Sequence, residues 1–296
     1  MYLMFIIIYY IESYFQYKMK FANYEYAEKI GQGTFGTIYK GWNIRTGEHV
    51  VIKMEPLTVE FSSIKHESSI LNILYTKRCR NIPPTYWYGT IHNPPSRVLV
   101  MPFYKESLET FLLESGKMAS NIMHSAISIL DHIHSKYVVH RDIKPANFMI
   151  HNNELVLIDF GLASFYVDPE ERHIPQANPK KLHIIGTPKY ASFHVHEGEE
   201  YSRRDDLISM VYVGLFFLYG KKLWSDIPHG GEILYEKSNI LHPVNKWFET
   251  NKTLKNISTM TKDWSQLSVF AEKVYKLSFQ ERPSYKEYIE LFTKTI

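Results

Sequence analysis

The stretch Val138-Val139-His140-Arg141-Asp142-Ile143-Lys144-Pro145-Ala146-Asn147 sets the frame for the whole chain. It places a carboxylate at Asp142, an amine at Lys144 and a carboxamide at Asn147, in the order H-R-D-x-x-x-x-N with a lysine in the gap. Asp142 can orient a hydroxyl group and accept its proton, and Lys144 can meet a phosphate. The carbonyl oxygen of Asn147 is a hard ligand suited to Mg²⁺. These residue types at this spacing predict a phosphoryl-transfer loop.

A second motif follows at the distance that a hairpin requires. Residues 148–150 and 155–158 are strand-like, and the turn-prone residues 151–154 join them. This hairpin would deliver Asp159-Phe160-Gly161 beside the loop, with Asp159 as the second Mg²⁺ ligand. The alternative is that both motifs are chance tripeptides in a core. Their order and the hairpin between them argue against it.

Composition restricts the class of protein further. The 296 residues suffice for two lobes with separate cores. The single Cys79 excludes an internal disulfide and is typical of a reducing compartment. A formal net charge of +3 without a concentrated basic patch argues against a nucleic-acid partner and is compatible with acidic protein substrates. The pairs His132/His134 and His194/His196 lack a third ligand at a recognised spacing, so we interpret them as surface or core histidines.

Two apolar segments raise the question of membrane insertion. Residues 1–11 are almost wholly apolar, but they fall short of the roughly 20 residues of a spanning helix and lack the marks of a secretory signal. We treat residues 1–21 as an N-terminal apolar extension, of which residues 1–18 are not native if Met19 is the natural start, with membrane attachment through residues 1–18 as the alternative. The run 207–219 is also too short and is expected to be a buried helix. No transmembrane span is therefore expected.

The expected ATP-binding residues begin with a glycine-rich loop between two strand-like runs. The pattern G-x-G-x-x-G lets the backbone approach phosphates, and the order strand-loop-strand separates it from dinucleotide-binding folds, which continue into a helix. The residues that we assign to ATP from this loop and the segments discussed next are Ile30, Gly31, Gln32, Gly33, Thr34, Phe35, Gly36, Ile38, Lys53, Glu67, Met101, Pro102, Tyr104 and Met149.

Lys53 and Glu67 are expected to form an ion pair. The strand Val50-Val51-Ile52-Lys53 matches V-A-I-K, in which the lysine contacts the α- and β-phosphates. Apolar residues at helical spacing over 62–75 predict a helix that turns Glu67 inward toward Lys53. The alternative, two solvated surface charges, fits the motif order less well.

A connector between lobes is expected after the strand 97–101. Met101 would flank the adenine, and the Pro102 carbonyl and the Tyr104 N–H would bind its edge, because Pro102 has no N–H of its own. Ile30, Ile38 and Met149 would enclose the purine.

Two further blocks show which kinases the chain resembles. Gly186-Thr187-Pro188-Lys189-Tyr190-Ala191-Ser192-Phe193 stands where most kinases have A-P-E and resembles the G-T-A-R-Y-A-S-I-N segment of the casein kinase I family. Tyr201-Ser202-Arg203-Arg204-Asp205-Asp206-Leu207 resembles that family's S-R-R-D-D-L. The resemblance covers about residues 22–294.

The resemblance implies an α+β, bilobal protein-kinase fold with a β-rich N-lobe over about 22–101, a hinge at 102–104 and a mostly helical C-lobe over 105–296. It also implies a monomeric serine/threonine kinase of the cytoplasm or nucleus that uses ATP and Mg²⁺. By the same resemblance, Thr187 would hydrogen-bond Asp142 and Lys144, and Asp206 would brace the backbone of the catalytic loop.

The resemblance further implies acidic or already phosphorylated protein substrates, held by an anion pocket of Lys180, Lys181 and Lys189. Two departures stand against this: Lys189 replaces an arginine and loses its bidentate fork, and the basic run expected after Leu223-Trp224 is reduced to Lys237. Elsewhere, Val211 replaces a usual glycine, and Phe193 occupies the place of the A-P-E carboxylate. These departures support the alternative function, a pseudokinase or scaffold that binds nucleotide or partners without phosphate transfer.

Overall fold

The computed structural model describes residues 19–32, 36–77, 79, 81–115, 120–176, 184–219 and 262–293. These residues fall into two compact units, one up to Tyr104 and the other from Lys105 onward. The segment 1–18 lies outside the described residues. So do five of the expected site residues, namely Gly33, Thr34, Phe35, Lys180 and Lys181.

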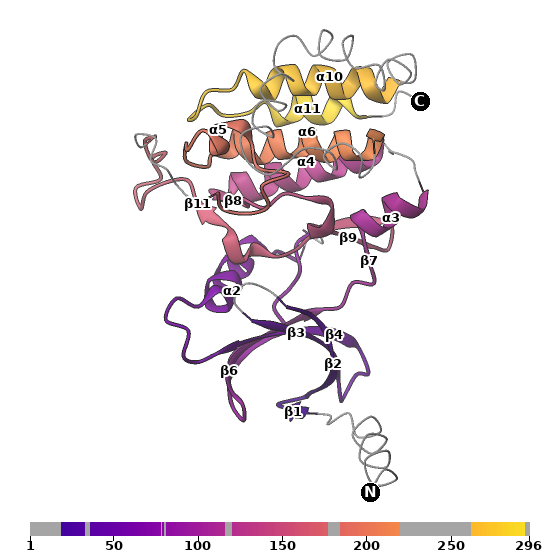
Figure 1. Cartoon of the computed structure of the whole chain (residues 1–296), viewed down its shortest axis with the longest axis vertical. Coiled ribbons are helices and arrows are strands. Elements are labelled where there is room, and N and C mark those ends of the chain that lie inside the picture. Colours follow the sequence, from indigo (N-terminus) through magenta and orange to yellow (C-terminus); the bar gives the residue numbers. More distant parts are fainter. Residues whose placement is uncertain are drawn as a thin grey trace, which may run out of the picture. The chain divides into compact units, whose positions relative to one another are not determined.

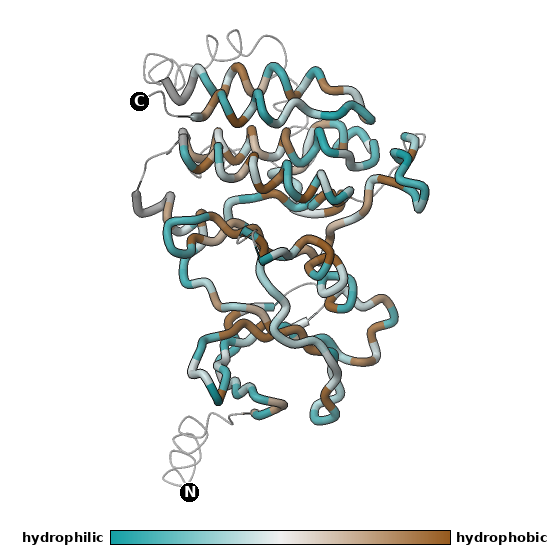
Figure 2. Tube along the Cα trace, turned by 180° about the vertical axis from the view of Figure 1, so that it is seen from behind, coloured by the Kyte–Doolittle hydropathy of each residue, from teal (hydrophilic) through white to brown (hydrophobic). Residues whose placement is uncertain are grey.

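The first unit is built on one antiparallel sheet with the strand order β1-β2-β3-β4-β6-β5 (Figure 1). Its strands are β1 (Met19–Phe21), β2 (Tyr24–Gln32), β3 (Thr37–Asn43), β4 (His49–Pro56), β5 (Trp87–His92) and β6 (Pro95–Pro102). Side chains alternate between the two faces of a strand, so the buried residues of β4 share one face, and these are Val50, Ile52 and Met54. The strands show hydrophobic stretches separated by hydrophilic turns (Figure 2).

The helix expected over 62–75 is present as α2 (Ser63–Leu74). Ser62 is its N-cap, since its side-chain oxygen accepts a hydrogen bond from the backbone N–H of Lys65 at 3.1 Å. Ile64, Leu71 and Leu74 are buried on the same helix as Glu67. The apolar residues whose spacing predicted this helix therefore lie on its buried face.

The second unit is mostly helical. Its helices are α3 (Leu108–Ser115), α4 (Ser120–Ser135), α5 (Phe193–His196), α6 (Arg203–Tyr219), α10 (Lys262–Tyr275) and α11 (Tyr285–Leu291). Helix α4 packs against α6 and α11, and α6 packs against α10 (Figure 1). Along α10 and α11 hydrophobic and hydrophilic residues alternate, as expected of helices with one solvent-exposed side (Figure 2).

Helix α6 begins at Arg203, four residues before the apolar run from which it was predicted. Asp205 and Asp206 lie in its first turn, where acidic side chains complement the positive end of the helix dipole. Leu207, Ile208 and Tyr212 are fully buried, so α6 is the central helix of this unit. Among the described residues, no helix combines the length and hydropathy needed to cross a bilayer.

Short strands carry the loops that hold the candidate site. They are β7 (Glu106–Ser107), β8 (Val138–Val139), β9 (Phe148–His151), β10 (Glu154–Leu157) and β11 (Ser164–Phe165), with 3-10 turns η1 (Pro145–Asn147) and η2 (Phe160–Leu162). The predicted hairpin is β9–β10. Its two-residue turn, Asn152-Asn153, has φ of 51° and 65°, the backbone of a type I′ turn. A β-rich unit followed by a helical unit confirms the predicted α+β class.

Candidate active site

The backbone of the loop between β8 and η1 is hydrogen-bonded to a carboxylate of α6. Asp206 Oδ2 accepts a hydrogen bond from the backbone N–H of His140 at 2.7 Å, and Oδ1 accepts one from the N–H of Arg141 at 3.0 Å. Arg141 has a φ of 67°, an uncommon conformation for a side-chain-bearing residue, and these two hydrogen bonds stabilise it. Asp206 therefore fixes the backbone immediately before Asp142.

Asp142 is fixed in turn by three groups. Thr187 donates two hydrogen bonds to Asp142 Oδ1, from its backbone N–H at 2.8 Å and from its hydroxyl at 2.7 Å. Lys144 Nζ lies 2.7 Å from Asp142 Oδ2 and 2.9 Å from Thr187 Oγ1. The Asp142 carboxylate is only 7% exposed. The three side chains thus form a closed, largely buried set of hydrogen bonds across 45 residues of sequence.

A glycine permits this close approach. Gly186 has a φ of 85°, and a Cβ at this position would lie 2.3 Å from the carbonyl oxygen of Arg141. Only glycine adopts this conformation without strain and leaves space for the carbonyl group. Gly186 therefore leaves room for the close approach, and Thr187, the next residue, makes the hydrogen bonds to Asp142.

Asn147 is oriented so that its carboxamide oxygen can serve a cation. Its Nδ2 donates to the Asp142 carbonyl at 2.8 Å and to Asp142 Oδ2 at 3.1 Å. Because the amide nitrogen makes these contacts, Oδ1 points the other way. The backbone N–H of Ile158 donates to the Asn147 carbonyl at 2.9 Å, so the residue after Ile158, Asp159, follows a segment that is bonded to Asn147. The carboxamide oxygen of Asn147 and the carboxylate of Asp159 are oxygen donors of the kind that Mg²⁺ prefers.

Two residues behind the loop were not among the predicted site residues. His134 Nε2 lies 2.9 Å from Asp206 Oδ2, and its Nδ1 is hydrogen-bonded to the hydroxyl of Tyr285 on α11. Burial would raise the pKa of Asp206, but the hydrogen bonds from His134 and from the His140 backbone outweigh it and hold this pKa below its ordinary value. His134, interpreted from the sequence as a surface or core histidine, is a core residue that supports the catalytic loop.

The first unit contains the predicted ion pair. Lys53 Nζ lies 2.8 Å from each oxygen of Glu67, and the two side chains are 14% and 3% exposed. Lys53 is on β4 and Glu67 on α2, so the pair joins the sheet to the helix. Lys53 lies beside Ile38 of β3 and Leu99 of β6 in the sheet register. Ile38 and Lys53 are therefore neighbours, as a shared nucleotide site requires.

The described part of the glycine-rich loop runs from the end of β2 into β3. Gly31 pairs with Ile38, and the side chains of Gln32 and Thr37 are hydrogen-bonded at 3.2 Å. A Cβ on Gly36, which comes just before β3, would lie 2.1 Å from the carbonyl oxygen of Met54 on β4, so the backbone leaves no room for any other residue here. Ile30, expected to cover the purine, is 42% exposed.

The hinge residues continue β6. Met101 pairs with Val51 and is 5% exposed, and Pro102 pairs with Val50. Tyr104 ends the first unit, and burial raises the pKa of its hydroxyl above the ordinary range. Met149 belongs to the second unit, where it pairs with Val156 in the β9–β10 hairpin. The structure thus gathers Asp142, Lys144, Asn147 and Thr187 in one unit, and pairs Lys53 with Glu67 in the other.

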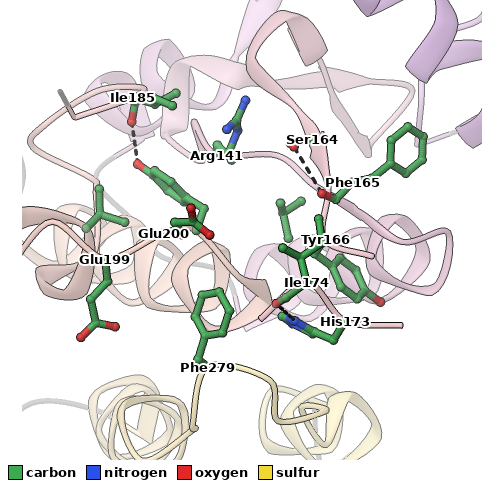
Figure 3. Close-up of a pocket in the computed structure, with 13 residues that line it drawn as sticks. Arg141, Ser164, Phe165, Tyr166, His173, Ile174, Ile185, Glu199, Glu200 and Phe279 are labelled. Carbon is green, nitrogen blue, oxygen red and sulfur yellow. Dashed lines mark hydrogen bonds between the residues drawn. The ribbon is translucent and has the colours of Figure 1, made fainter. Parts of the chain in front are cut away.

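A pocket of about 370 Å³ lies next to the catalytic loop in the second unit (Figure 3). Its walls are mainly aromatic and aliphatic, and its polar groups include Arg141, Glu199 and Glu200. The Arg141 Nε–H donates to the Leu162 carbonyl at 2.6 Å, and burial lowers the pKa of its guanidinium. Of the predicted anion pocket, only Lys189 lies within the described residues, and it is exposed.

Comparison with known proteins agrees with this geometry. The family model described as "Protein kinase domain" matches residues 24–291. The chain belongs to the protein kinase domain family.

Within that family its sequence is similar to two curated yeast proteins. It is 32% identical over 286 residues to casein kinase I homolog 2 of Schizosaccharomyces pombe, covering 92% of this chain and 62% of the relative. It is 33% identical over 283 residues to casein kinase I homolog 2 of Saccharomyces cerevisiae, covering 90% of this chain and 48% of the relative. The predicted resemblance to casein kinase I is confirmed. The chain spans between about half and three fifths of the length of these relatives.

Proposed function

We propose that this protein is a serine/threonine protein kinase of casein kinase I type, which transfers the γ-phosphate of ATP to protein hydroxyl groups with the help of Mg²⁺. The observation that carries the proposal is the position of Asp142. Its two oxygens are held by Thr187 and Lys144, and the backbone before it is held by Asp206. Phosphoryl transfer depends mainly on such positioning and on neutralising charge.

Each residue of this set has a separate task. Asp142 orients the hydroxyl of the substrate and takes up its proton. Lys144 bridges Asp142 and Thr187 and presents a positive charge where the transferred phosphate must pass. Thr187 keeps the Asp142 carboxylate from rotating, because it donates twice to the same oxygen. The substrate hydroxyl therefore meets a carboxylate whose orientation is already set.

Asn147 and Asp159 would hold Mg²⁺, which when bound neutralises phosphate charge. In the first unit, Lys53 would bind the α- and β-phosphates, and Glu67 holds the Lys53 amine in place. We assign the backbone of the glycine-rich loop and of the hinge to the rest of the nucleotide. Ile30, Ile38, Met101 and Met149 supply apolar side chains for the adenine.

We further propose acidic or primed substrates, a monomeric state and a location in the cytoplasm or nucleus. Lys189 is exposed and close in sequence to Thr187, so its amine can bind an acidic residue or a phosphate on the substrate. This supports the proposed substrate preference. The names of the two yeast relatives support casein as a test substrate. Glu199 and Glu200 beside Arg141 make the charge around the pocket mixed, so we expect only a modest preference for primed substrates.

Phosphate transfer from radiolabelled Mg-ATP to dephosphorylated casein and to a primed peptide tests the proposal, with Asp142→Asn as the matched blank. We expect transfer by the wild type and a loss of about 100-fold or more in Asp142→Asn, with nucleotide binding retained. The ratio of the transfer rates on the two substrates is measured for the wild type and for Lys189→Met. A change in this ratio shows that Lys189 binds the phosphate of the primed peptide. Transfer by Asp142→Asn at the wild-type rate, or nucleotide binding without any transfer by the wild type, would overturn it.

A further inference from the structure

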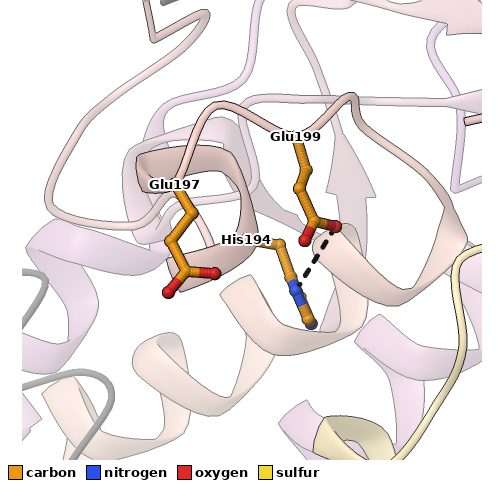
Figure 4. Close-up of side chains that lie close together, drawn as sticks. All are labelled: His194, Glu197 and Glu199. Atoms are coloured by element: carbon orange, nitrogen blue, oxygen red, sulfur yellow. Dashed lines mark ion pairs between the residues drawn. The ribbon is translucent and has the colours of Figure 1, made fainter. Parts of the chain in front are cut away.

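Three side chains with metal-ligand atoms converge at the end of α5, and none of them is among the residues assigned to catalysis. They are His194 on the helix and Glu197 and Glu199 in the segment that follows (Figure 4). One ligand atom from each lies within 4.8 Å of the other two. The sequence offered His194 and His196 as a pair, but His196 Nε2 is 3.0 Å from the Pro188 carbonyl and does not belong to this group.

The imidazole of His194 is the first sign that the group serves a ligand. Its side chain is 13% exposed, and both ring nitrogen atoms are buried without a hydrogen bond to any residue that the structure describes. Glu199 Oε2 lies 3.5 Å from Nδ1, which is ion-pair distance without hydrogen-bond geometry. Buried polar atoms normally have partners, so two in one ring require an explanation. A metal ion at Nδ1 would satisfy one of them.

Glu199 is held in the way that metal-binding carboxylates usually are. Its Oε2 accepts hydrogen bonds from Arg204 and, at 2.8 Å, from Gln176. These partners fix the carboxylate, and Oε1 remains for a ligand. Ligating carboxylates are commonly oriented by such outer hydrogen bonds. The backbone N–H of Glu199 also donates to the His194 carbonyl at 3.0 Å, which fixes the loop between the two residues.

The local charge admits a cation despite the nearby guanidinium. Arg204 is the positive group that pairs with Glu199, and it also lies 3.8 Å from Asp205. Two carboxylates, those of Glu199 and Asp205, therefore lie within ion-pair distance of this guanidinium, and Glu197 adds a third negative group to the cluster. Glu197 is exposed, so it can adjust its side chain and leaves the cluster open to solvent.

We propose that His194, Glu197 and Glu199 form a binding site for a divalent transition-metal ion, Zn²⁺ above all, with a water molecule as fourth ligand. One imidazole and two carboxylates are a donor set that suits Zn²⁺, which takes four ligands in tetrahedral geometry. Mg²⁺ and Ca²⁺ favour oxygen donors alone, so this site is distinct in chemistry from Asn147 and Asp159.

A metal ion here would cross-link the segment that bears the catalytic contacts. Helix α5 begins after Ser192, whose hydroxyl is hydrogen-bonded to Asp205 on α6. The same stretch is tied to Pro188, next to Thr187, by His196. We therefore expect Zn²⁺ to stabilise the fold, because a ligand that binds only the folded state raises the melting temperature.

Co²⁺ is the probe, since its visible absorption reports tetrahedral coordination. The full chain is first freed of metal with a chelator. It is then placed in a buffer that contains excess Mg²⁺ and no nucleotide, and it is titrated with Co²⁺ and afterwards with Zn²⁺. We expect an intense visible band that saturates at one Co²⁺ per chain, its loss when Zn²⁺ is added, and a higher melting temperature with Zn²⁺. This readout does not depend on kinase activity, so it stands apart from the proposed function.

Matched variants decide the result. Glu197→Gln and His194→Asn should each weaken Co²⁺ binding at least about 10-fold, whereas Glu200→Gln, a neighbouring carboxylate outside the cluster, should bind as the wild type does. Glu197 is exposed, so its substitution leaves folding intact and keeps the test decisive even if His194→Asn is unstable. Absence of the band in the wild type, or unchanged binding in Glu197→Gln, would overturn the proposal.

Discussion

The two units hold their key charged residues in different ways. In the first unit, Lys53 forms an ion pair with Glu67, which reaches it from helix α2. In the second, Asp142 is fixed by contacts from Thr187, Lys144 and Asn147. The Lys53–Glu67 ion pair is lost when α2 shifts, whereas a closed set of hydrogen bonds survives the loss of one member in part. The position of the Lys53 amine in the first unit thus depends on where α2 lies, and the position of the Asp142 carboxylate in the second is fixed by several groups.

The largest expected effect comes from breaking the Lys53–Glu67 ion pair. Lys53→Met should lower kcat by about 100-fold to 1,000-fold, because it removes a positive charge aimed at the phosphates. Glu67→Gln should cost less, since it leaves Lys53 charged but poorly placed. In a double-mutant cycle the two losses should be far from additive, because both remove one interaction. Steady-state kinetics of the four proteins check this, and additive losses would show that the pair does not act as a unit.

Thr187→Val tests the redundancy around Asp142. The variant loses the hydroxyl that contacts Asp142 and Lys144 but keeps the backbone N–H bond to the same carboxylate. We expect kcat to fall by roughly 10-fold to 100-fold, with the KM for ATP unchanged. Thr187→Ser keeps a hydroxyl and should retain most of the activity. A Thr187→Val enzyme with wild-type kcat would show that the backbone contact alone suffices.

Tyr285→Phe probes the support behind the loop. Removing the hydroxyl leaves a buried nitrogen of His134 without this partner, at a cost of about 1–3 kcal/mol in the free energy of unfolding. If Tyr285 acts through His134 and Asp206 on the loop, kcat should also fall a few-fold at temperatures well below the melting transition. Denaturant unfolding and kinetics on the same preparation separate the two. A loss of stability at unchanged kcat would make Tyr285 purely structural.

The last prediction concerns the pH dependence of stability. Asp205 and Asp206 are adjacent, yet burial raises the pKa of Asp205 to about 6 while hydrogen bonds lower that of Asp206. The folded protein therefore keeps a proton on Asp205 that the unfolded chain releases near pH 4, so the stability gained from this proton is lost as pH rises through about 6. Asp205→Asn cannot titrate and should gain stability relative to wild type across that window.

The expected gain is at most on the order of 3 kcal/mol, from about 1.4 kcal/mol for each pKa unit. Urea unfolding of wild type and Asp205→Asn between pH 4 and 7 measures it, with midpoints compared at each pH. Parallel curves would mean that Asp205 is ionised throughout this range.

Local features were readable from the sequence. The α2 helix follows from apolar residues at helical spacing, and the β9–β10 hairpin from strand-like runs around Asn152-Asn153. The ion pair of Lys53 with Glu67 follows from placing one residue on a strand and the other on the inner face of a helix. Each of these predictions needs only neighbours within a few turns of chain.

Contacts across long sequence separations were not readable in this way. Nothing in the pattern around His134 shows that its imidazole meets Asp206, 72 residues away, or Tyr285, 151 residues away. The start of α6 was also missed, because the charged residues before Leu207 look like a loop until their place in the first helical turn is seen. His194 was interpreted, together with His196, as a surface or core histidine, since no third ligand stands at a recognised metal spacing, whereas the structure brings Glu197 and Glu199 close to His194.

The sequence by itself determined the residue types and the family, because H-R-D-x-x-x-x-N, D-F-G and G-T-P-K-Y-A-S specify chemistry at fixed short spacings. The family resemblance led us to expect that Thr187 contacts Asp142 and that Asp206 contacts the loop, but only the tertiary structure showed how these contacts form and which further groups complete them. The packing of α4, α6 and α11 brings Asp206, His134 and Tyr285 together, and the positive φ of Gly186 lets Thr187 reach Asp142. The physical reason is that spacing along the chain controls local geometry, whereas the partners of a buried polar group are set by packing.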